Sequence, residues 1–499
     1  MGRNLYELFR SRFPADRQRP VLFDERDRRL TYAEAESSLF RMVGAFTAAG
    51  IRPGDRIAVQ AEKSPELLVL YLASLAGGFV FQPINPAYRE GELSHLLADA
   101  EPRLVVCQPS QAERMAALSR ARVLTLGADG TGTLPAAAAA AMPTHPICDR
   151  GADDPAALLY SSGTTGKPKG AILTHGNLAS NGEALAQSWG FSSSDRLLHA
   201  LPLFHAHGLF VAVSCALLSG ATMRFLPRFD IASVLHFLPE TTVFMGVPTY
   251  YTRLLQEPAF GPHVCRSIRL FVSGSAPLLA ETFNRFRALT GQPILERYGL
   301  TETLMNSSNP LHGERVAGSV GLPLPGISMR IADAEDRALG DAEIGEIQVK
   351  GPNVCRGYWR NPAKTAEAFT ADGWFRTGDL GRRDARGYYF IVGRAKDLII
   401  SGGLNVYPKE VEDCIDAVDG VAESAVVGVA DADFGEAVVA AVVRRSADPH
   451  PDETEVIRYV KERLANYKVP KQVRFLPELP RNAMGKVEKA QLRKLFAPR

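Results

Sequence analysis

The sequence predicts an α/β protein in which layered parallel sheets occupy most of the chain and a smaller α+β region follows them. In the first and middle parts of the chain, short apolar runs of strand length alternate with amphipathic helical stretches, which is the pattern of strand–helix–strand units. Near Asp379 the pattern changes to short alternating strands with tight turns. After Gly393 the sequence becomes a compact mixture of helices and strands. With 499 residues, the chain is long enough for two domains.

The first elements can be justified one by one. Thr31 and Glu34 have the spacing of a capping box, which predicts a helix that begins there and ends at Gly50. The next expected elements are a strand at 56–60, a helix at 65–75 and a strand at 80–83, and further strands are expected at 104–107, 242–246 and 270–273. Six alanines between Pro135 and Pro143 predict a short surface helix or a linker.

The last third of the chain predicts short strands within 345–351 and 387–393. Beyond them a helix is expected at 409–416, strands at 425–429 and 437–444, and a helix at 452–466. A boundary near Lys396 fits this change of pattern. It divides the chain into an N-terminal domain of residues 1–395 and a C-terminal domain of residues 396–499.

Composition favours a globular enzyme of a reducing compartment. The 57 basic and 55 acidic residues nearly cancel to a net charge of +2, so neither nucleic acid nor a membrane is an expected partner. Six cysteines lie far apart without a C-x-x-C pair, which favours reduced thiols over disulfides or zinc ligands. The apolar stretch 67–83 is interrupted by Gly77 and Gly78, and it is shorter than the roughly 20 apolar residues of a membrane helix. A cytoplasmic location is therefore expected.

The first 13 residues lack the apolar core of a secretory signal. They are amphipathic and carry arginines, so a cleaved organelle transit peptide remains an alternative. Glu7 and Asp16 count against that alternative, because transit peptides are poor in acidic residues.

The segment YSSGTTGKPKG, residues 160–170, resembles a phosphate-binding loop but is not a Walker A loop. Ser161 stands where the first glycine of that motif belongs, and Pro168 follows Lys167. Its composition still suits a polyphosphate, because hydroxyls, backbone amides at glycines and two ammonium groups can surround an anion. A mobile turn rich in Gly, Ser and Thr explains the composition equally well. The groups concerned are Ser161, Ser162, Gly163, Thr164, Thr165, Gly166, Lys167 and Lys169.

Six further segments follow this loop in a characteristic order. They decide between a phosphate-binding loop and a mobile turn. They are LPLFHAHG at 201–208, SGSAPL at 273–278, RYGLTE at 297–302, WFRTGDLG at 374–381, GRAKDLIISGG at 393–403 and PRNAMGKVEK at 480–489. With these motifs the chain resembles, over nearly its whole length, the adenylate-forming superfamily of acyl-CoA synthetases, luciferases and peptide-synthetase adenylation domains.

The resemblance implies a fold, a reaction and a set of cofactors. The fold would be a large N-terminal domain of layered α/β sheets with a β-barrel-like part, and a small mobile α+β C-terminal domain. A carboxylate would attack the α-phosphate of ATP in the presence of Mg²⁺, pyrophosphate would leave, and the acyl-adenylate would pass to the thiol of coenzyme A. The loop at 160–170 would hold the departing phosphates.

The resemblance also assigns catalytic roles. Lys486 matches the catalytic lysine of the C-terminal domain, although an exposed lysine on a turn is the ordinary interpretation elsewhere. Glu302 matches the magnesium ligand, and it would also be stabilised near a helix N-terminus. Thr301 would contact the α-phosphate.

Other matched positions would bind the nucleotide or serve domain motion and coenzyme A. Asp379 and Arg394 would hold the ribose hydroxyls, with a simple turn residue as the alternative for Asp379, and Lys396 would be the hinge. The adenine would lie against Tyr298 and a wall formed by Ser275, Ala276 and Pro277. The pantetheine arm of coenzyme A would pass Gly402 and Gly403, where side chains would crowd it.

Arg297 is the residue that suggests which acid is used. Its position lies at the acyl pocket in this superfamily, where a fatty or aromatic acid needs no cation, whereas a guanidinium suits a second carboxylate. The surrounding residues closely resemble those of malonyl-CoA synthetases, so malonate is the expected substrate and methylmalonate the next. Ser275 and Met305 would line the pocket, and His205 would lie beside it. Alternatively, Arg297 pairs with a carboxylate of the protein itself.

Three other functions compete with this prediction. They are a short-chain monocarboxylate or aryl-CoA synthetase, a stand-alone adenylation enzyme that loads a carrier protein, and a luciferase-like oxygenase. A metal site built on His205 and His207 lacks a third ligand of suitable spacing. Because the charge of Lys486 is essential in the expected mechanism, we also expect a lysine acetyltransferase and a deacetylase to act on it.

Overall fold

The computed structural model describes residues 4–144, 146–161, 168–401, 404–431, 434–445, 450–482 and 485–496. The chain divides into two compact units, which are described separately. The first unit is Met1–Met329 with Val349–Phe375, and the second is Arg330–Gln348 with Arg376–Arg499. This division reflects only how the residues pack against one another. The domain boundary predicted between residues 395 and 396 stays a prediction.

The first unit contains a six-stranded sheet in the order β6-β5-β3-β4-β7-β8. All neighbours are parallel except β7 and β8, which form an antiparallel pair. The strands are β3 (Arg56–Gln60), β4 (Val80–Pro83), β5 (Leu104–Cys107), β6 (Arg122–Thr125), β7 (Pro155–Ser161) and β8 (Lys169–Thr174). The associated helices are α2 (Tyr32–Ala48), α3 (Pro65–Ala76), α4 (Glu90–Ala100), η1 (Pro109–Gln111), α5 (Ala112–Leu118) and α6 (Thr133–Ala140).

Several sequence predictions are confirmed in this sheet. Strands β3, β4 and β5 have the predicted bounds, and α3 extends one residue beyond its prediction. The capping box of Thr31 and Glu34 is present at the start of α2. Gly50 follows this helix with a φ of 78°, which a residue with a Cβ would rarely adopt.

A nine-stranded sheet completes the first unit, in the order β15-β14-β13-β12-β11-β9-β10-β1-β2. The N-terminal strand β1 pairs in parallel with β10, although Asp24 and Arg224 are 200 residues apart in sequence. The strands are β1 (Pro20–Asp24), β2 (Arg29–Thr31), β9 (Arg196–His199), β10 (Thr222–Phe225), β11 (Val243–Gly246), β12 (Leu270–Ser273), β13 (Leu295–Leu300), β14 (Leu304–Ser308) and β15 (Leu322–Pro323). The helices are α1 (Leu5–Arg12), α7 (His175–Ser188), η2 (His207–Val213), α8 (Ser214–Ser219), α9 (Ile231–Phe237), η3 (Leu238–Glu240), α10 (Pro248–Gln256) and α11 (Ala280–Thr290).

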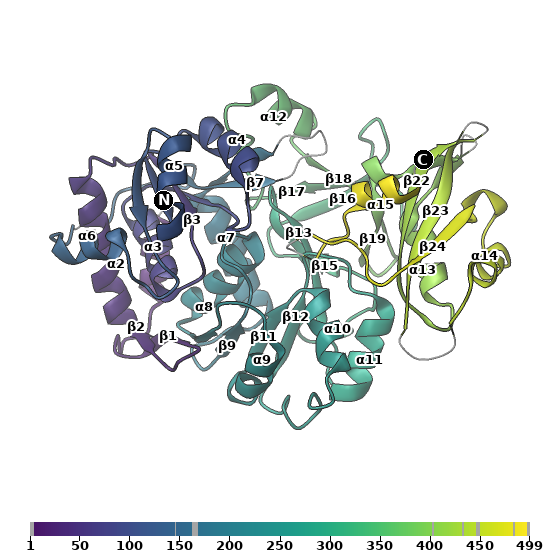
Figure 1. Cartoon of the computed structure of the whole chain (residues 1–499), viewed down its shortest axis with the longest axis horizontal. Helices are drawn as coiled ribbons and strands as arrows, with labels where there is room; N and C mark the ends of the chain where they lie inside the picture. Colours follow the sequence, from purple (N-terminus) through teal and green to yellow (C-terminus); the bar gives the residue numbers. More distant parts are fainter. Residues whose placement is uncertain are drawn as a thin grey trace. The chain divides into compact units, whose positions relative to one another are not determined.

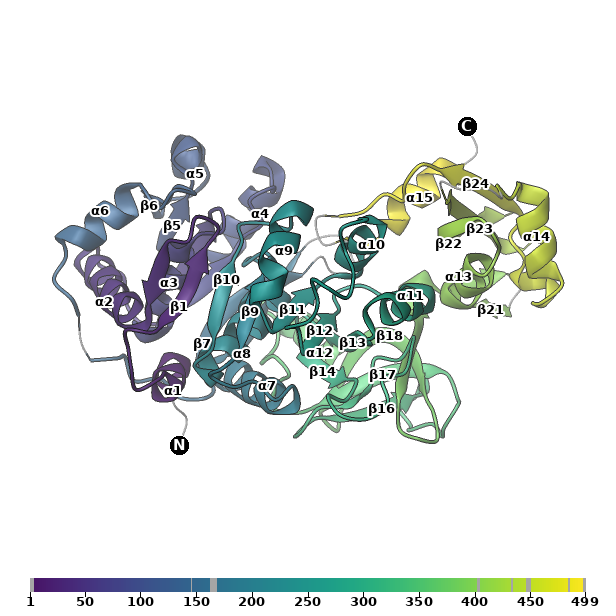
Figure 2. The ribbon, with the colours of Figure 1, turned by 90° about the horizontal axis from the view of Figure 1, so that it is seen from below.

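Helices α9, α10 and α11 lie beside strands β11 and β12 in both ribbon views (Figures 1 and 2). Between them is an aromatic core in which Tyr251, Phe271 and Phe286 are fully buried. The rings of Phe271 and Phe286 meet edge to face, with their centroids 4.9 Å apart. Such pairs add about 0.5–1.5 kcal/mol to the burial of the rings, so this core holds the three helices against β11 and β12, and β12 pairs with β13.

A four-stranded sheet, β16-β17-β18-β19, forms the β-rich part that was expected before the C-terminal region. Its strands are β16 (Ser328–Ala332), β17 (Gly345–Lys350), β18 (Phe375–Arg383) and β19 (Tyr389–Arg394), and α12 (Pro362–Ala368) lies between β17 and β18 in sequence. The division between the two units passes through strands of this sheet. Strands β18 and β19 pair antiparallel, with Asp379 opposite Arg394.

The second unit contains a five-stranded sheet in the order β21-β20-β23-β22, with β24 also paired to β23. Its elements are η4 (Ala395–Asp397), β20 (Ile399–Ser401), β21 (Leu404–Val406), α13 (Pro408–Asp416), β22 (Val421–Asp431), β23 (Gly435–Arg444), α14 (Glu453–Lys461), η5 (Asn466–Lys468), β24 (Gln472–Leu476) and α15 (Lys489–Phe496). A core of Val411, Ile415, Val438 and Val456 joins α13 and α14 to the sheet. The prediction of one helix over 452–466 was wrong at its end, because α14 stops at Lys461.

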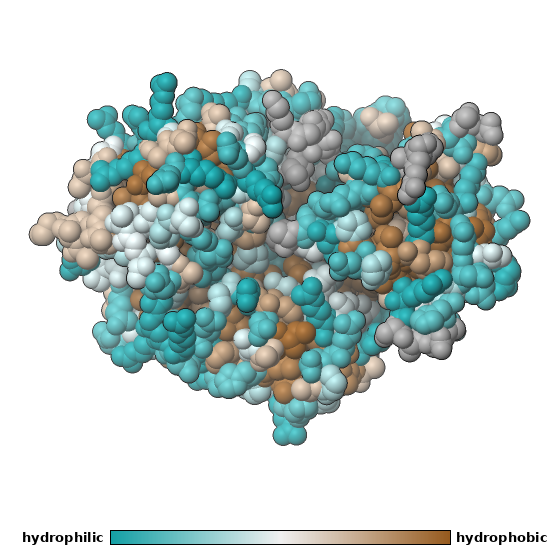
Figure 3. Space-filling view, in the orientation of Figure 1, coloured by the Kyte–Doolittle hydropathy of each residue, from teal (hydrophilic) through white to brown (hydrophobic). Residues whose placement is uncertain are grey.

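Hydrophilic side chains cover much of the face drawn in Figure 3, and hydrophobic ones gather in separate areas between them. Within the described residues, no helix combines the length and the apolar character needed to cross a membrane. All six cysteines are free thiols, four of them buried, as predicted.

Candidate active site

Glu302 is held in the turn between β13 and β14 by two hydroxyl groups. Ser161, the last residue of β7, donates its Oγ–H to Glu302 Oε1 at 2.7 Å. Tyr358 donates its phenol O–H to the same oxygen at 3.2 Å. Burial, reinforced by the charge of Glu302, raises the pKa of Tyr358, so the phenol keeps its proton and remains a donor. The carboxylate of Glu302 is thereby fixed at the start of the predicted phosphate loop.

The backbone beside Glu302 is fixed as well. The N–H of Cys355 donates to the carbonyl of Glu302 at 2.7 Å. Lys169, at the far end of the same loop, places its ammonium group 5.4 Å from the centre of the Tyr358 ring. Ser161 and Lys169 of the predicted phosphate loop therefore lie in one network with Glu302, which was predicted from a different motif. Ser162, Gly163, Thr164 and Thr165 lie outside the described residues.

This donor set is suitable for Mg²⁺ held mainly by phosphate. Among the described residues, no group of three or more His, Cys, Asp or Glu side chains is arranged to hold a metal ion. Mg²⁺ commonly takes one or two protein carboxylates and completes its shell with water and substrate phosphates. Glu302, whose Oε1 is held by hydroxyls, fits the single hard oxygen donor that such a site requires.

Arg297 is a buried cation on β13, and two of its donor nitrogens have no hydrogen-bond partner in the described part of the chain. Only 3% of the residue is exposed, and its Nε and Nη2 atoms are buried without a hydrogen-bond partner there. Burial lowers the pKa of Arg297 to about 9, and the neighbouring Glu296 acts in the opposite direction. Glu296 instead accepts the N–H of Leu278 at 3.1 Å. An unpaired buried guanidinium is costly, so this arrangement is suited to an anionic ligand.

Gly274 makes room for the guanidinium. A Cβ at this position would lie 2.5 Å from Arg297 Cζ and 2.6 Å from its Nε, distances that no real Cβ contact shows. The glycine of the SGSAPL motif therefore determines where Arg297 can lie.

His207 lies close to Arg297 and was missed as a site residue. It is 1% exposed, and its Nδ1 is 3.3 Å from Ser275 Oγ. Burial, with a smaller contribution from the charge of Arg297, lowers the pKa of His207, so the ring is neutral. If Nδ1 accepts from Ser275, Nε2 carries the proton, and Nε2 is a buried group without a partner among the described residues. His207 can therefore donate to a ligand beside Arg297.

Met305 and His205 are the other residues that were predicted to lie at the acyl pocket. Met305, on β14, is buried, and its Cε lies 2.7 Å from where a Cβ on Gly299 would be. Its backbone is fixed by Asn181 on α7, which accepts from Met305 N at 3.2 Å and donates to Met305 O at 2.7 Å. His205 is partly buried, with its ring centroid 5.8 Å from that of Phe204.

Two residues of this site have strained backbone conformations. Ser275 has a φ of 72° and Leu304 a φ of 51°, in the left-handed region that non-glycine residues rarely adopt. Such conformations persist where the surrounding structure holds them in place, often at functional sites. The predicted adenine wall begins at Ser275, with Ala276 partly buried and Pro277 exposed. Tyr298 is buried on β13 and Thr301 lies partly buried in the turn after it.

In the second unit, the structure brings together the pair predicted to hold the ribose. Arg394 Nε lies 3.0 Å from Asp379 Oδ1, and the two residues face each other across β18 and β19. Asp379 is buried and Arg394 is partly exposed, so the carboxylate is oriented by an arginine from the neighbouring strand.

The predicted catalytic lysine and hinge also belong to the second unit. Lys486 is exposed and closes a tight turn, in which its N–H donates to Asn482 Oδ1 at 3.1 Å and its carbonyl accepts from Asn482 N at 2.9 Å. Lys396 lies in η4, where burial lowers its pKa. Gly402 and Gly403 lie outside the described residues.

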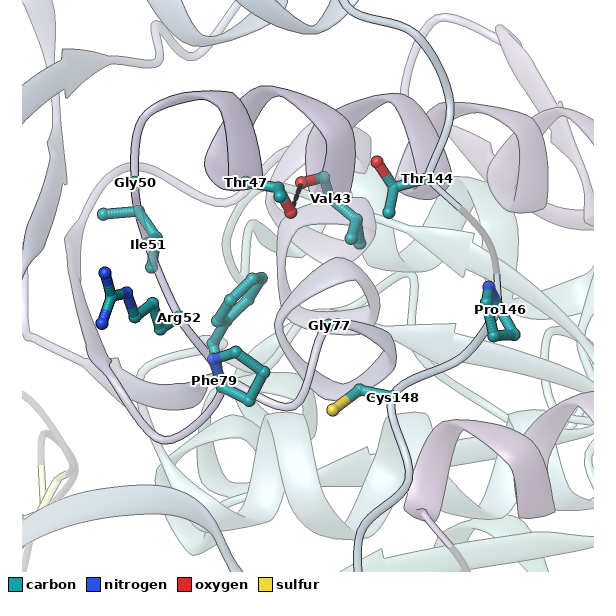
Figure 4. A pocket seen from close by; sticks show the side chains of 11 residues that line it. Val43, Thr47, Gly50, Ile51, Arg52, Gly77, Phe79, Thr144, Pro146 and Cys148 are labelled. Carbon is teal, nitrogen blue, oxygen red and sulfur yellow. Dashed lines mark hydrogen bonds between the residues drawn. The ribbon is translucent and has the colours of Figure 1, made fainter.

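A separate surface cavity, of about 470 Å³, contains none of the predicted site residues. Val43, Ile51 and Phe79 form apolar walls, and the side chain of Cys148 lies at its edge (Figure 4). Thr47 donates its hydroxyl to the Val43 carbonyl at 2.9 Å rather than to the cavity. The largely apolar lining offers no convergent polar groups, so we assign it no role.

The first unit, a layered α/β structure in which Ser161 and Tyr358 hold Glu302, and the second unit, which carries the Asp379–Arg394 pair, have the features of a nucleotide-binding enzyme of the adenylate-forming type. Residues 9–359 match the family described as AMP-binding enzyme, and residues 410–486 match the AMP-binding enzyme C-terminal domain. The chain belongs to the AMP-binding enzyme family, which confirms the resemblance based on the seven motifs.

Several characterised proteins and solved structures are similar to this chain over most of its length. A malonate–CoA ligase of Arabidopsis thaliana is 38% identical over 483 residues, which cover 89% of this chain and 78% of the relative. A feruloyl-CoA synthase of an Amycolatopsis species is also 38% identical, over 471 residues and 94% of each chain. The ATP-bound crystal structure of MatB from Rhodopseudomonas palustris is 50% identical, covers 99% of both chains and has a TM-score of 0.97.

Proposed function

We propose that this protein is an ATP-dependent acid–thiol ligase that converts malonate and coenzyme A into malonyl-CoA, with AMP and pyrophosphate as the other products. The observation that carries the proposal is the buried guanidinium of Arg297, which lacks a partner among the described residues and lies near the neutral His207. A dicarboxylic acid would supply the missing anion, and a monocarboxylic acid would not.

The reaction would proceed in two displacements. In the first, an oxygen of one malonate carboxylate forms a bond to the α-phosphorus of ATP, and the bond from that phosphorus to the bridging oxygen of pyrophosphate breaks. In the second, the coenzyme A sulfur forms a bond to the activated carbonyl carbon, AMP leaves, and the thiol proton passes to solvent. Both carboxylate and triphosphate are anions, so positive charge is needed where they meet.

The residues of the chain would share this task. Lys486 would place its ammonium group between the carboxylate and the α-phosphate, and Thr301 would donate to that phosphate. Glu302 would hold Mg²⁺, which supplies positive charge to the phosphates when bound. The loop residues Ser161, Ser162, Gly163, Thr164, Thr165 and Lys169 would bind the departing pyrophosphate.

The nucleotide would be oriented by residues from both units. Tyr298 and the backbone at Ser275, Ala276 and Pro277 would contact the adenine. Asp379, oriented by Arg394, would accept hydrogen bonds from the ribose hydroxyls.

The second carboxylate of the substrate would be bound by Arg297 and His207. A guanidinium can pair with a carboxylate through two parallel N–H donors, and the Nε2–H of His207 would add a third. Met305 and Ser275 would limit the space at the middle carbon, where methylmalonate carries its extra methyl group. His205 would lie beside the acyl chain.

Two relatives support different acids. The malonate–CoA ligase of Arabidopsis thaliana supports a dicarboxylate, whereas the feruloyl-CoA synthase of Amycolatopsis supports an aryl acid. We favour the dicarboxylate because an aryl acid would leave the buried Nε and Nη2 donors of Arg297 without an acceptor.

A panel of acids tests the proposal. The purified protein would receive ATP, Mg²⁺ and one of malonate, methylmalonate, acetate, butyrate or ferulate, with and without coenzyme A, and AMP release would be measured. We expect malonate to give the highest kcat/KM and a thioester only with coenzyme A. Faster turnover of butyrate or ferulate would refute the dicarboxylate assignment.

The C-terminal domain, residues 396–499, would move between the two displacements about a hinge at Lys396. The pantetheine arm would then pass Gly402 and Gly403. Limited proteolysis with and without a stable acyl-adenylate analogue would test this motion, since cleavage near residue 396 should change with the bound ligand.

The proposal also covers the regulation of Lys486 by acetylation and the location of the protein in the cell. Acetylation of Lys486 by an acetyltransferase, reversed by a deacetylase, would remove the charge on which adenylation depends. The exposure of Lys486 supports this, and mass spectrometry of the protein from cells would detect the acetyl group. The six free cysteines support a cytoplasmic location, which cell fractionation would test.

A further inference from the structure

Lys63 is a buried lysine that the proposed reaction does not use. It lies between β3 and α3 and is only 7% exposed. Its Nζ is 2.7 Å from His199 Nδ1, 2.7 Å from the His199 carbonyl and 2.9 Å from the Leu201 carbonyl. The ring of Phe225 lies on another side of the ammonium group, 4.3 Å from Nζ to the ring centre. Lys63 is therefore held by acceptors from the last residue of β9 and from Leu201 just after it.

The positions of the protons follow from these contacts. His199 Nε2 lies 2.8 Å from the Gly208 carbonyl, which can only accept, so Nε2 carries the hydrogen. Burial, with Lys63 beside it, lowers the pKa of His199, so the ring is neutral and Nδ1 is an acceptor. Lys63 must then donate to three acceptors, and only the ammonium form has three N–H groups. Burial lowers the pKa of Lys63, but these three bonds favour the charged form.

The four hydrogen bonds join both ends of one loop. The segment Leu201–Gly208, the pocket loop, is bound through Leu201 at its start and through Gly208 at its end. A Cβ at Gly208 would lie only 1.9 Å from the Pro202 carbonyl, so the two ends are in direct contact. The pocket loop carries His207, the histidine close to Arg297.

We propose that Lys63 is a positioning residue, which holds the pocket loop in the shape that presents His207 to the second carboxylate of the substrate. Its role rests on the proposed function, because the carboxylate is the ligand of that site. Lys63 acts through His199 and the loop backbone, and it is not a catalytic residue.

The test compares Lys63→Met with Arg315→Met. Methionine keeps most of the length of lysine but cannot donate. Arg315 is a matched control in the same unit, since its guanidinium also donates to three carbonyls, those of Pro310 at 3.2 Å, Pro293 at 2.6 Å and Leu311 at 3.0 Å, outside the pocket loop. Two readouts are needed, amide hydrogen exchange of peptides from 199–210 and the KM values for malonate and ATP.

We expect Lys63→Met to speed exchange in 199–210 by about tenfold or more and to raise the KM for malonate by a similar factor, because carbonyls and a ring nitrogen lose their donor. The KM for ATP should stay within about twofold. Arg315→Met should change neither the exchange of 199–210 nor the ratio of the two KM values. Unchanged exchange in folded Lys63→Met, or equal increases in both KM values, would overturn the proposal.

A second variant keeps the proposal testable if Lys63→Met does not fold. His199→Leu removes the Nδ1 acceptor and the Nε2 donor and leaves Lys63 two carbonyl acceptors, so the same two changes are expected, and their absence would overturn the role. Failure of the wild-type protein to release AMP with malonate would refute the proposed function instead. The exchange comparison requires no malonate and would then decide on its own whether Lys63 holds the loop.

Discussion

At the scale of single residues, the guanidinium of Arg297 is the group whose removal is most informative. In Arg297→Leu the charge is lost while an apolar side chain fills part of its space. Removing one member of a buried charge pair costs about 3–5 kcal/mol. We therefore expect the KM for malonate to rise by more than about a hundredfold, as measured by AMP release.

ATP and a monocarboxylate are the controls for this variant. The KM for ATP should be unchanged, and the activity with butyrate should not fall. Normal turnover of malonate by Arg297→Leu would show that another residue binds the second carboxylate.

Gly274 offers an independent test of the same position. In Gly274→Ala the new Cβ would lie 2.5 Å from Arg297 Cζ, so the flexible arginine must move while the fold is kept. We expect a rise of about tenfold or more in the KM for malonate, with little change in the melting temperature.

Gly91→Ala is the matched control, because no atom lies within 4 Å of a Cβ built there. This variant should be as active as the wild type and, since Gly91 is in α4, slightly more stable. Equal kinetics for Gly274→Ala and Gly91→Ala would contradict the role of Gly274.

At the scale of elements, local sequence patterns predicted the bounds of several strands well, and they predicted the end of helix α14 poorly. Strand β12 has the predicted bounds because a short run of buried apolar residues has few other uses in an α/β chain. Helix α14 was predicted too long, because its apolar residues continue in sequence after the helix ends at Lys461. Tertiary contacts then decide where a helix ends.

The candidate site, too, could be predicted only in part from the sequence. The order of the motifs led to the prediction of Ser161, Glu302, Asp379 and Arg394 as site residues. In the structure Ser161 contacts Glu302, and Asp379 contacts Arg394. The burial of His207 had no signal in the sequence beyond its place in LPLFHAHG. The network of Lys63 had none at all, because a lone lysine before an apolar helix is usually exposed, and its acceptor His199 is 136 residues away.

Helix α1 is attached to α7 by a contact that should respond to pH. The N–H of Leu5 donates to Nδ1 of His175 at 3.0 Å, and His175 is fully buried. Burial, with a smaller contribution from Arg150 and an opposing one from Asp154, lowers the pKa of His175 from 6.5 to about 4.

The sign of the effect follows from this shift. The unfolded chain binds a proton at His175 near pH 6.5, whereas the folded protein resists protonation down to about pH 4. Acid therefore favours unfolding within that window, and this group should remove about 2 kcal/mol of stability between pH 7 and pH 5. Stability from this group is complete above pH 6.5.

His175→Asn should abolish this part of the pH dependence, because the asparagine oxygen can still accept from Leu5 but does not titrate. Urea unfolding of both proteins at pH 7, 6 and 5 would measure the difference. Parallel pH curves for the variant and the wild type would mean that His175 does not titrate in this way.

At the scale of the whole molecule, the proposed reaction needs residues from two units. Glu302 and Arg297 belong to the first unit, and Lys486 and Asp379 to the second. A residue that acts in only one of two displacements can be recognised by measuring each displacement separately.

Lys486→Ala should separate them. We expect pyrophosphate release from ATP and malonate to fall by about a thousandfold or more, while thioester formation from supplied malonyl-adenylate and coenzyme A stays within about threefold of the wild type. Equal losses in both displacements would contradict the role of Lys486 in adenylation alone.

The pairing of β1 with β10 has a consequence for biosynthesis. As the nascent chain leaves the ribosome, β1 appears 200 residues before its partner, a wait of about 10–40 s at ~5–20 residues per second. The strands from β3 to β8 and the antiparallel pair of β1 with β2 can form during that time, whereas the edge of β1 that pairs with β10 stays open. Since an open strand edge readily pairs with other chains, we expect this edge of β1 to need protection during translation.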